Sequence, residues 1–293
     1  MDIKKFIKEQ KLSTFPVGLG GCRNSGIGFD SCDYDIFVFD EKSGQEIITF
    51  EDDFVMVHHC SLSETLSKNL LQYDNLQIIQ DESWELRMML SKISEKRTLL
   101  YRDFSKNSVI ESLFCCQKTR DAVQSSDAFA SCWQKCAAYY LADAISSINQ
   151  QRTNPSHLLD SLRKLEKSPI NVHISTVTES IGIERATPSL LERMLKSTIG
   201  FSDLVEKNGH SKIIQNKHDY FVNNSMLSDC YFYLGYVNKE NFIKIKDTLN
   251  RNQDLIHILK VGFNVEVDSN LLIRQADLIQ ESCNDMLAII SQE

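Results

Sequence analysis

Long apolar runs are absent from this chain of 293 residues. A helix that crosses a bilayer needs about 20 consecutive apolar residues, and no stretch approaches that length. The opening residues MDIKKFIKEQKL place charges between Ile3, Phe6 and Ile7, which predicts a short amphipathic helix rather than a signal peptide. We therefore expect no membrane partner and a cytoplasmic location.

Paired cysteine motifs are also missing, although the chain has nine cysteines. None of them forms a C-x-x-C pair, the spacing typical of zinc and redox sites. Cytosolic thiols stay reduced, and Cys132 and Cys136 lie one helical turn apart. The cysteines are therefore predicted to be small buried side chains rather than metal ligands.

An excess of basic residues is missing as well. The chain has 32 lysines and arginines against 40 aspartates and glutamates, which gives a net charge of −8. A protein that binds nucleic acid through a broad surface normally presents clustered positive charge. The balance disfavours nucleic acid as a partner and favours a small molecule or a protein.

Two phosphate-binding motifs are absent. The sequence has no G-x-x-x-x-G-K-[ST] segment, which excludes a P-loop NTPase. The segments that begin at Gly18 and at Gly26 follow G-x-G-x-x but lack the final glycine. The dinucleotide-binding fingerprint is therefore missing too.

Glycine is distributed unevenly along the chain, with none between Gly44 and Gly182. Because glycine marks turns and loops, its absence predicts long helices in the later part of the chain. The fold class is therefore predicted to be α+β. A small mixed α/β domain, residues 1–82, is expected to precede an all-α helical-bundle domain, residues 83–293.

The first domain is predicted to contain short strands, because apolar alternation is bounded there by turn residues. A capping box, Ser61-x-x-Glu64, predicts a helix start, and Asn154-Pro155 and Thr187-Pro188 predict two more in the second domain. The expected elements of the first domain are a helix over 2–11, strands at 15–19 and 33–39, a hairpin over 45–60, a helix over 61–72, a strand over 75–80 and a helix from about Trp84.

The second domain concentrates aromatic residues in the segment CYFYLGY. Tyr231, Tyr233 and Tyr236 either line a pocket for an acceptor or pack in a helical core. Packing is the default for aromatic residues at helical spacing.

Five of the eleven glycines lie between Gly18 and Gly28, and Asp33-Tyr34-Asp35 follows them. Side chains alternate along a strand, so both carboxylates point to one face of a strand that is apolar on both faces. Two like charges held there repel each other unless a bound cation neutralises them. Mg²⁺ is suitable, because it takes one or two carboxylates and completes its shell with water and phosphates. For an isolated D-x-D, turn or capping residues are the alternative.

The order of glycine turn, spacer, D-x-D and buried strand resembles the nucleotidyltransferase superfamily of DNA polymerase β. Here Gly20-Gly21 is followed by eleven residues and then by Asp33-Tyr34-Asp35. The resemblance covers residues 15–82. The helices that follow are similar in layout to kanamycin nucleotidyltransferase and to the minimal nucleotidyltransferases. The resemblance implies a metal-dependent enzyme that transfers a nucleoside monophosphate from a nucleoside triphosphate (NTP) to an acceptor hydroxyl.

The resemblance also implies roles for particular residues. Gly20 and Gly21, with Arg23 close behind them, would bind the nucleotide. Asp33 and Asp35 would be catalytic as ligands of Mg²⁺ or Mn²⁺, and two such ions can stabilise the attacking and leaving oxygens.

The family's third carboxylate, on a neighbouring strand, has no counterpart here, because FVMVHHC and LQIIQ contain no acid. His58 lies near the expected place and can accept a proton as a neutral imidazole. The alternative is a satisfied core histidine. The missing acid also supports a second hypothesis, a catalytically degenerate nucleotidyltransferase-like module that binds nucleotide or protein partners.

Overall fold

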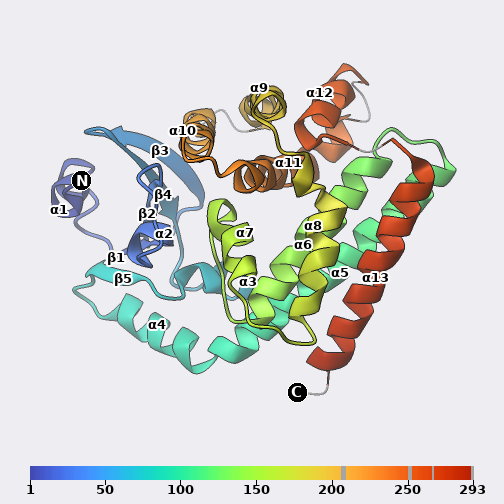
Figure 1. Cartoon of the computed structure of the whole chain (residues 1–293). Helices are drawn as coiled ribbons and strands as arrows, with labels where there is room; N and C mark the ends of the chain where they lie inside the picture. The colour runs from blue at the N-terminus through green and yellow to red at the C-terminus, as the bar shows by residue number, and fades with distance from the viewer. Residues whose placement is uncertain (206–208, 250–252, 266, 292–293) are drawn as a thin grey trace. The chain divides into compact units, whose positions relative to one another are not determined.

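The computed structural model describes all residues except 206–208, 250–252, 266, 292 and 293. The chain divides into two compact units (Figure 1). Unit 1 comprises Met1–Asp103 with Asn208–Ile213, and unit 2 comprises Phe104–Lys207 with Ile214–Glu293. A five-stranded sheet in unit 1 and helices in unit 2 confirm the α+β class. The assignment of separate functions to residues 1–82 and 83–293 stays a prediction.

Unit 1 is built on a mixed sheet with the strand order β3-β4-β2-β1-β5. Strands β2 and β4 are parallel, and all other neighbours are antiparallel. The elements of this unit are α1 (Ile3–Glu9), β1 (Val17–Gly20), α2 (Gly21–Asn24), β2 (Tyr34–Val38), β3 (Gly44–Phe50), β4 (Asp53–His59), α3 (Ser67–Leu70), η1 (Leu71–Tyr73), β5 (Gln77–Gln80), α4 (Glu85–Glu95) and the start of α5 (Arg97–Gln124).

One face of the sheet forms the apolar core of unit 1, and α1 packs against it (Figure 1). Asp2 caps α1 by accepting backbone N–H groups from the first turn, which fixes the helix start. The Phe6 ring then meets Phe50 edge-on at 5.2 Å. The buried residues of this core are Phe6, Ile7, Val17, Leu19, Ile36, Val38, Phe50, Val55 and Val57.

The predicted helix from Ser61 is wrong. The Ser61 hydroxyl donates to Glu41 and accepts the backbone N–H of Ser63 at 3.0 Å, but Glu64 accepts the two backbone N–H groups that follow it. Because the Glu64 carboxylate is bonded there and not to the backbone N–H of Ser61, the capping box does not close. The first helical residue after them is Ser67.

Unit 2 is helical, and both of the helix starts predicted at proline are confirmed: α7 begins at Pro155 and α9 at Pro188. Asn154 caps α7 by accepting the backbone N–H of Ser156 at 3.1 Å. The elements of unit 2 are the rest of α5, α6 (Ala130–Ile148), α7 (Pro155–Arg163), η2 (Asn171–His173), α8 (Ile174–Ile181), η3 (Ile183–Arg185), α9 (Pro188–Val205), most of α10 (His210–Asn223), α11 (Leu227–Leu249), α12 (Gln253–Phe263) and α13 (Ser269–Ile290).

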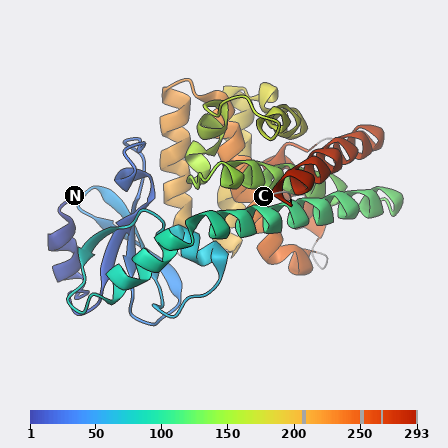
Figure 2. The same ribbon diagram turned by 90° about the horizontal axis from the view of Figure 1, so that it is seen from below.

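Helix α6 lies at the centre of unit 2 and is buried on almost every side. It packs against α8, α11 and α13. Helix α5 approaches it closely, because Ser112 donates to a carbonyl of α6 at 2.8 Å. Arg120 of α5 binds Asp277 of α13 at 2.8 Å, and Figure 2 shows α13 (red) alongside this part of α5 (green). No helix in the described ranges is long and apolar enough to cross a membrane.

Candidate functional site

Strand β2 places Asp35 in the interior of the sheet. Its partner on β1 is Gly20, and its partner on β4 is Met56. Alternation along the strand turns Asp35 away from the apolar core of unit 1 and toward the other face. Asp33 precedes the strand, and the two residues are only 3% and 8% exposed. The structure therefore holds two carboxylates, two residues apart, out of bulk water.

The two glycines of the turn make room for different neighbours. A Cβ atom on Gly20 would come within 2.7 Å of Leu76 and of the Phe37 ring, so this glycine serves packing. Gly21 has a φ of +71°, and a Cβ atom there would lie 2.0 Å from Asp35 Oδ2. Only glycine tolerates both that backbone conformation and that proximity. The turn at Gly21 therefore lies directly against the Asp35 carboxylate.

His58 of β4 lies on the same face and binds Asp35. The distance from His58 Nε2 to Asp35 Oδ1 is 2.9 Å, and both side chains are about nine-tenths buried. The other ring nitrogen, Nδ1, lies 3.0 Å from Gln45 Nε2. The Phe37 ring stacks on the imidazole at 4.4 Å with an interplanar angle of 9°. Three neighbours therefore fix the position and the orientation of His58.

This arrangement is satisfied by a neutral imidazole that carries its proton on Nε2. Nε2–H then donates to Asp35, and Nδ1 accepts from the Gln45 amide. The arrangement explains how a histidine is accommodated beside Asp35. The predicted role of His58 as a base stays a prediction.

Arg23 holds the loop between α2 and β2. Its Nε donates to the Cys32 carbonyl and its Nη2 to the Asp30 carbonyl, both at 2.9 Å. The guanidinium also stacks on the Tyr34 ring at 4.6 Å and lies 3.8 Å from Asp53. These contacts fix the approach of the chain to Asp33. Nucleotide binding by Arg23 stays a prediction.

The acids at the ends of the neighbouring strands have other partners. Asp53, which begins β4, pairs with the amino group of Met1 at 3.3 Å. Asp81, just after β5, accepts the backbone N–H of Arg87 at 2.9 Å. Neither replaces the third carboxylate that the resemblance implies. His58 is the polar side chain that β4 brings to Asp35.

The ligand atoms of these residues are of the type that a divalent cation binds. Carboxylate oxygens, as in Asp33 and Asp35, are the ligands that Mg²⁺ and Mn²⁺ take, and the absence of a Cβ on Gly21 lets the turn lie directly against Asp35. Within the described part of the chain, Asp33, Asp35 and His58 do not form a group whose ligand atoms all lie within 4.8 Å of one another. Asp35 with His58 is therefore the close pair, and Asp33 is a separate donor.

Gln45 is not among the residues predicted for the site, although the sequence contains a signal for it. The β3–β4 hairpin has a two-residue loop, because Phe50 pairs with Asp53. That register alone pairs Gln45 with His58. A polar residue opposite a histidine on one face of a hairpin can bind it.

The three tyrosines of the CYFYLGY segment pack within unit 2, as the default predicted. Tyr231 and Tyr233 are 1% and 3% exposed, and the Tyr231 hydroxyl donates to the Ile181 carbonyl at 3.3 Å. The Tyr236 hydroxyl donates to Asp143 at 2.9 Å. These contacts support packing in the helical core and do not support the alternative, a pocket for an acceptor lined by the three rings.

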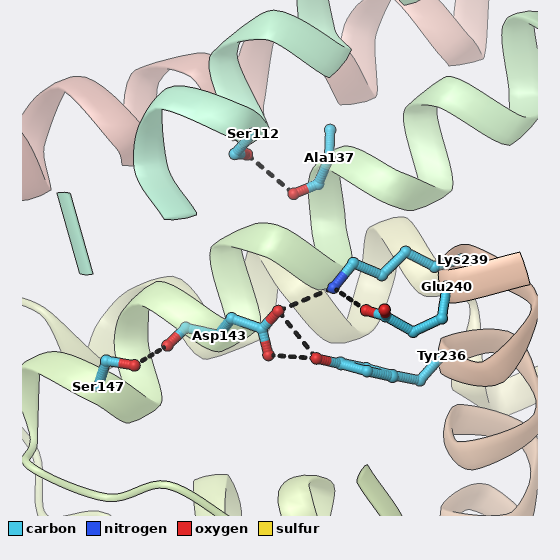
Figure 3. A network of polar contacts seen from close by, with 7 residues as sticks. All are labelled: Ser112, Ala137, Asp143, Ser147, Tyr236, Lys239 and Glu240. Carbon is cyan, nitrogen blue, oxygen red and sulfur yellow. Dashed lines mark hydrogen bonds and ion pairs between the residues drawn. The ribbon is translucent and has the colours of Figure 1, made fainter. Parts of the chain in front are cut away.

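A second cluster of ionisable side chains lies between α6 and α11 (Figure 3). Lys239 is 2% exposed, and its Nζ binds Asp143 at 2.9 Å and Glu240 at 3.1 Å. It also lies over the Tyr140 and Tyr236 rings at 4.1 and 4.2 Å. Burial lowers the pKa of Lys239, but these neighbours outweigh it and hold the pKa well above its ordinary value. The ammonium is charged and paired, so the cluster joins two helices.

No protein-family model and no curated protein matches this chain in sequence. Among solved structures, the chain is similar to a nucleotidyltransferase-like protein from Exiguobacterium sibiricum. The sequence identity is 14%, the match covers 87% of this chain and 89% of that chain, and the TM-score is 0.36. A TM-score this low does not establish a common fold, so the function proposed below depends on the residues of the site.

Proposed function

We propose that the chain is a metal-dependent nucleotidyltransferase, which transfers a nucleoside monophosphate from an NTP to an acceptor hydroxyl. The contact between Gly21 and Asp35 carries the proposal. A glycine turn in the left-handed conformation lies so close to a buried carboxylate that the Asp35 oxygen takes the place of any Cβ atom on the turn. Backbone N–H groups of a glycine turn can bind an anionic phosphate, and the adjacent carboxylate can bind its cation.

The proposed roles follow from the positions of the residues. Asp33 and Asp35 would hold Mg²⁺ or Mn²⁺, and Gly20 and Gly21 would face the triphosphate with their backbone. The cation neutralises charge on the transferred phosphoryl group. The chain's own contribution is to fix these groups before the substrate arrives, which lowers the entropic part of the barrier.

His58 would orient Asp35. Its Nε2 meets Asp35 and its Nδ1 meets Gln45, so a role as the base for the acceptor requires one of these hydrogen bonds to break. The acceptor itself is proposed to be a small molecule or a protein. A net charge of −8 does not favour a long nucleic acid.

A second candidate is a nucleotide-binding module that transfers nothing. The hydrogen bond between His58 and Asp35 favours it, because an imidazole can satisfy this carboxylate without a cation. In that case the Asp35 carboxylate would not need to bind metal. A substitution that removes the charge of Asp33 should then leave ligand binding unchanged.

An assay with an α-³²P-labelled NTP, Mn²⁺ and a cell extract tests the first candidate. Wild-type protein should transfer label to a stable product, and Asp33→Asn should reduce this on the order of 10²-fold or more. Separation of the extract by size then assigns the acceptor to small molecules or to proteins.

The matched control is Asp52→Asn, the same change at an exposed carboxylate in the β3–β4 turn, which should leave transfer unchanged. Transfer that survives Asp33→Asn contradicts the proposal. Nucleotide binding without transfer in the wild type supports the second candidate.

A further inference from the structure

We propose that His58 is a nitrogen ligand of the cation that Asp35 binds, and that the site consequently prefers Mn²⁺ to Mg²⁺. This inference rests on the proposed function, since it takes Asp35 to be a metal ligand. It goes further because it assigns a role to the residue that lies where an acid is missing. It also assigns a role to Gln45.

The distance between His58 and Asp35 agrees with a shared ion. Two neighbouring ligands of an octahedral ion, each about 2.1 Å from it, lie about 3.0 Å apart. The observed separation of Nε2 and Oδ1 is 2.9 Å. A cation can therefore replace the Nε2 proton while the two donor atoms keep nearly the same spacing.

The surroundings of His58 suit a ligating imidazole. A histidine that binds metal usually donates its other ring N–H to a partner, which fixes the ring and its tautomer. The Gln45 amide lies 3.0 Å from Nδ1, and an amide offers both a donor and an acceptor. Rotation of the amide lets Gln45 donate to Nδ1 without a cation and accept from Nδ1–H with one. Phe37 holds the ring plane in both cases.

An imidazole changes the choice of metal. Mg²⁺ strongly prefers oxygen ligands, whereas first-row transition metals accept nitrogen, and Mn²⁺ also accepts carboxylates. The close pair of one carboxylate and one imidazole, Asp35 and His58, therefore favours Mn²⁺ over Mg²⁺. A third carboxylate in place of His58 would not provide this preference.

Pulsed electron paramagnetic resonance of Mn²⁺ bound to the full chain, with and without ATP, tests the inference. The wild type should show modulation from a directly bound ¹⁴N nucleus, and labelling of the histidines with ¹⁵N should change its frequencies. His58→Asn should abolish the modulation. Gln45→Leu, a change at an exposed residue, should weaken Mn²⁺ binding about 10-fold or more and leave Mg²⁺ binding much less affected.

His59→Gln is the matched control, because His59 is the adjacent histidine of β4 and binds Asp40 instead, at 2.9 Å. It should retain the modulation. Bound Mn²⁺ without nitrogen modulation in the wild type overturns this inference and leaves the proposed metal site in place. If Mn²⁺ does not bind with or without ATP, the inference and the proposed function both fail. The ¹⁵N labelling decides the wild-type result even if His58→Asn does not fold.

Discussion

At the scale of single residues, Gly20 and Gly21 are adjacent but needed for different reasons. At Gly20 a side chain would collide with Leu76 and Phe37, whereas Gly21 combines a positive φ with contact to the Asp35 carboxylate. Because apolar packing and a left-handed turn are separate constraints, they can be separated by substitution. The left-handed turn at Gly21 is the constraint that involves the proposed site.

Gly21→Ala should abolish nucleotide binding and lower the free energy of unfolding by more than Gly26→Ala. Gly26 has a φ of +73° but nothing within 4 Å of an added Cβ atom, so alanine there should cost only the left-handed strain of about 1–2 kcal/mol. Thermal melts of both variants, with and without ATP and Mn²⁺, provide the measurement. Equal destabilisation with nucleotide binding retained would contradict the role given to Gly21.

The residues of the site were predictable to different degrees. Strand alternation predicts the face of Asp35, which lies in β2, whereas Asp33 precedes the strand. Hairpin register pairs Gln45 with His58. The contact between His58 and Asp35 was not predictable, because it depends on the parallel pairing of β2 with β4. Strands that are not joined by a hairpin leave no local signal of their register.

At the scale of elements, local signals succeeded where one side chain had one available partner. Asn154 caps α7 as predicted, since its carboxamide has the N–H of Ser156 within reach. The capping box at Ser61 does not form, because the Glu64 carboxylate accepts the two backbone N–H groups that follow it. Local hydrogen bonds from side chains to the backbone compete with a helix start in this way.

The Lys239–Asp143 pair joins α6 and α11, and its loss should be costly. Lys239→Met leaves Asp143 buried without its cation, so unfolding should become easier by about 3–5 kcal/mol. Equilibrium urea unfolding measures this. In the double variant with Asp143→Asn the loss should be smaller than the sum of the two single losses by about 0.5–3 kcal/mol.

Lys164→Met is the matched control, because Lys164 pairs with Asp160 at 2.6 Å but is 70% exposed. Exposed pairs of this kind contribute about 0–1 kcal/mol. A loss for Lys239→Met no larger than for Lys164→Met would show that the buried cluster does not hold the two helices together.

At the scale of the whole molecule, the α+β class was predictable because strand-like alternation and helical periodicity separate along the chain. The sequence changes character at residue 82, but unit 1 continues into α5. Asp74 explains this continuation, since it accepts from Arg97 Nε and from the Tyr101 hydroxyl, each at 2.9 Å. Ion pairs between distant positions leave no periodic pattern, so the sequence does not indicate them.

All nine cysteines are buried and none forms a disulfide, which predicts sensitivity to alkaline pH. Burial raises the thiol pKa of Cys60 and Cys283 to about 11, and of Cys116 and Cys132 to about 12, from 9.0. The folded chain therefore keeps protons that the unfolded chain loses. This stabilisation is complete below pH 9 and is lost as the pH rises through 11 to 12.

The urea midpoint should consequently fall as the pH rises from 9 to 11. Between pH 7 and 8.5 the thiols stay mostly protonated in both states, so their contribution to the midpoint should be nearly constant. Thiol alkylation at pH 8 should be slow in the folded protein and should reach nine groups after unfolding. A midpoint that stays constant up to pH 11 would contradict the burial of these thiols.

The central claim is that the Gly20–Asp35 segment binds an NTP with a divalent cation. Thermal unfolding with Mg²⁺ or Mn²⁺ and each NTP, for the wild type and for Asp33→Asn/Asp35→Asn, tests it most directly. A ligand at 100 times its Kd adds about 2.7 kcal/mol to the free energy of unfolding. A metal-dependent shift is expected in the wild type and should disappear in the double variant. No shift with any saturating nucleotide, or the same shift in both proteins, would contradict it.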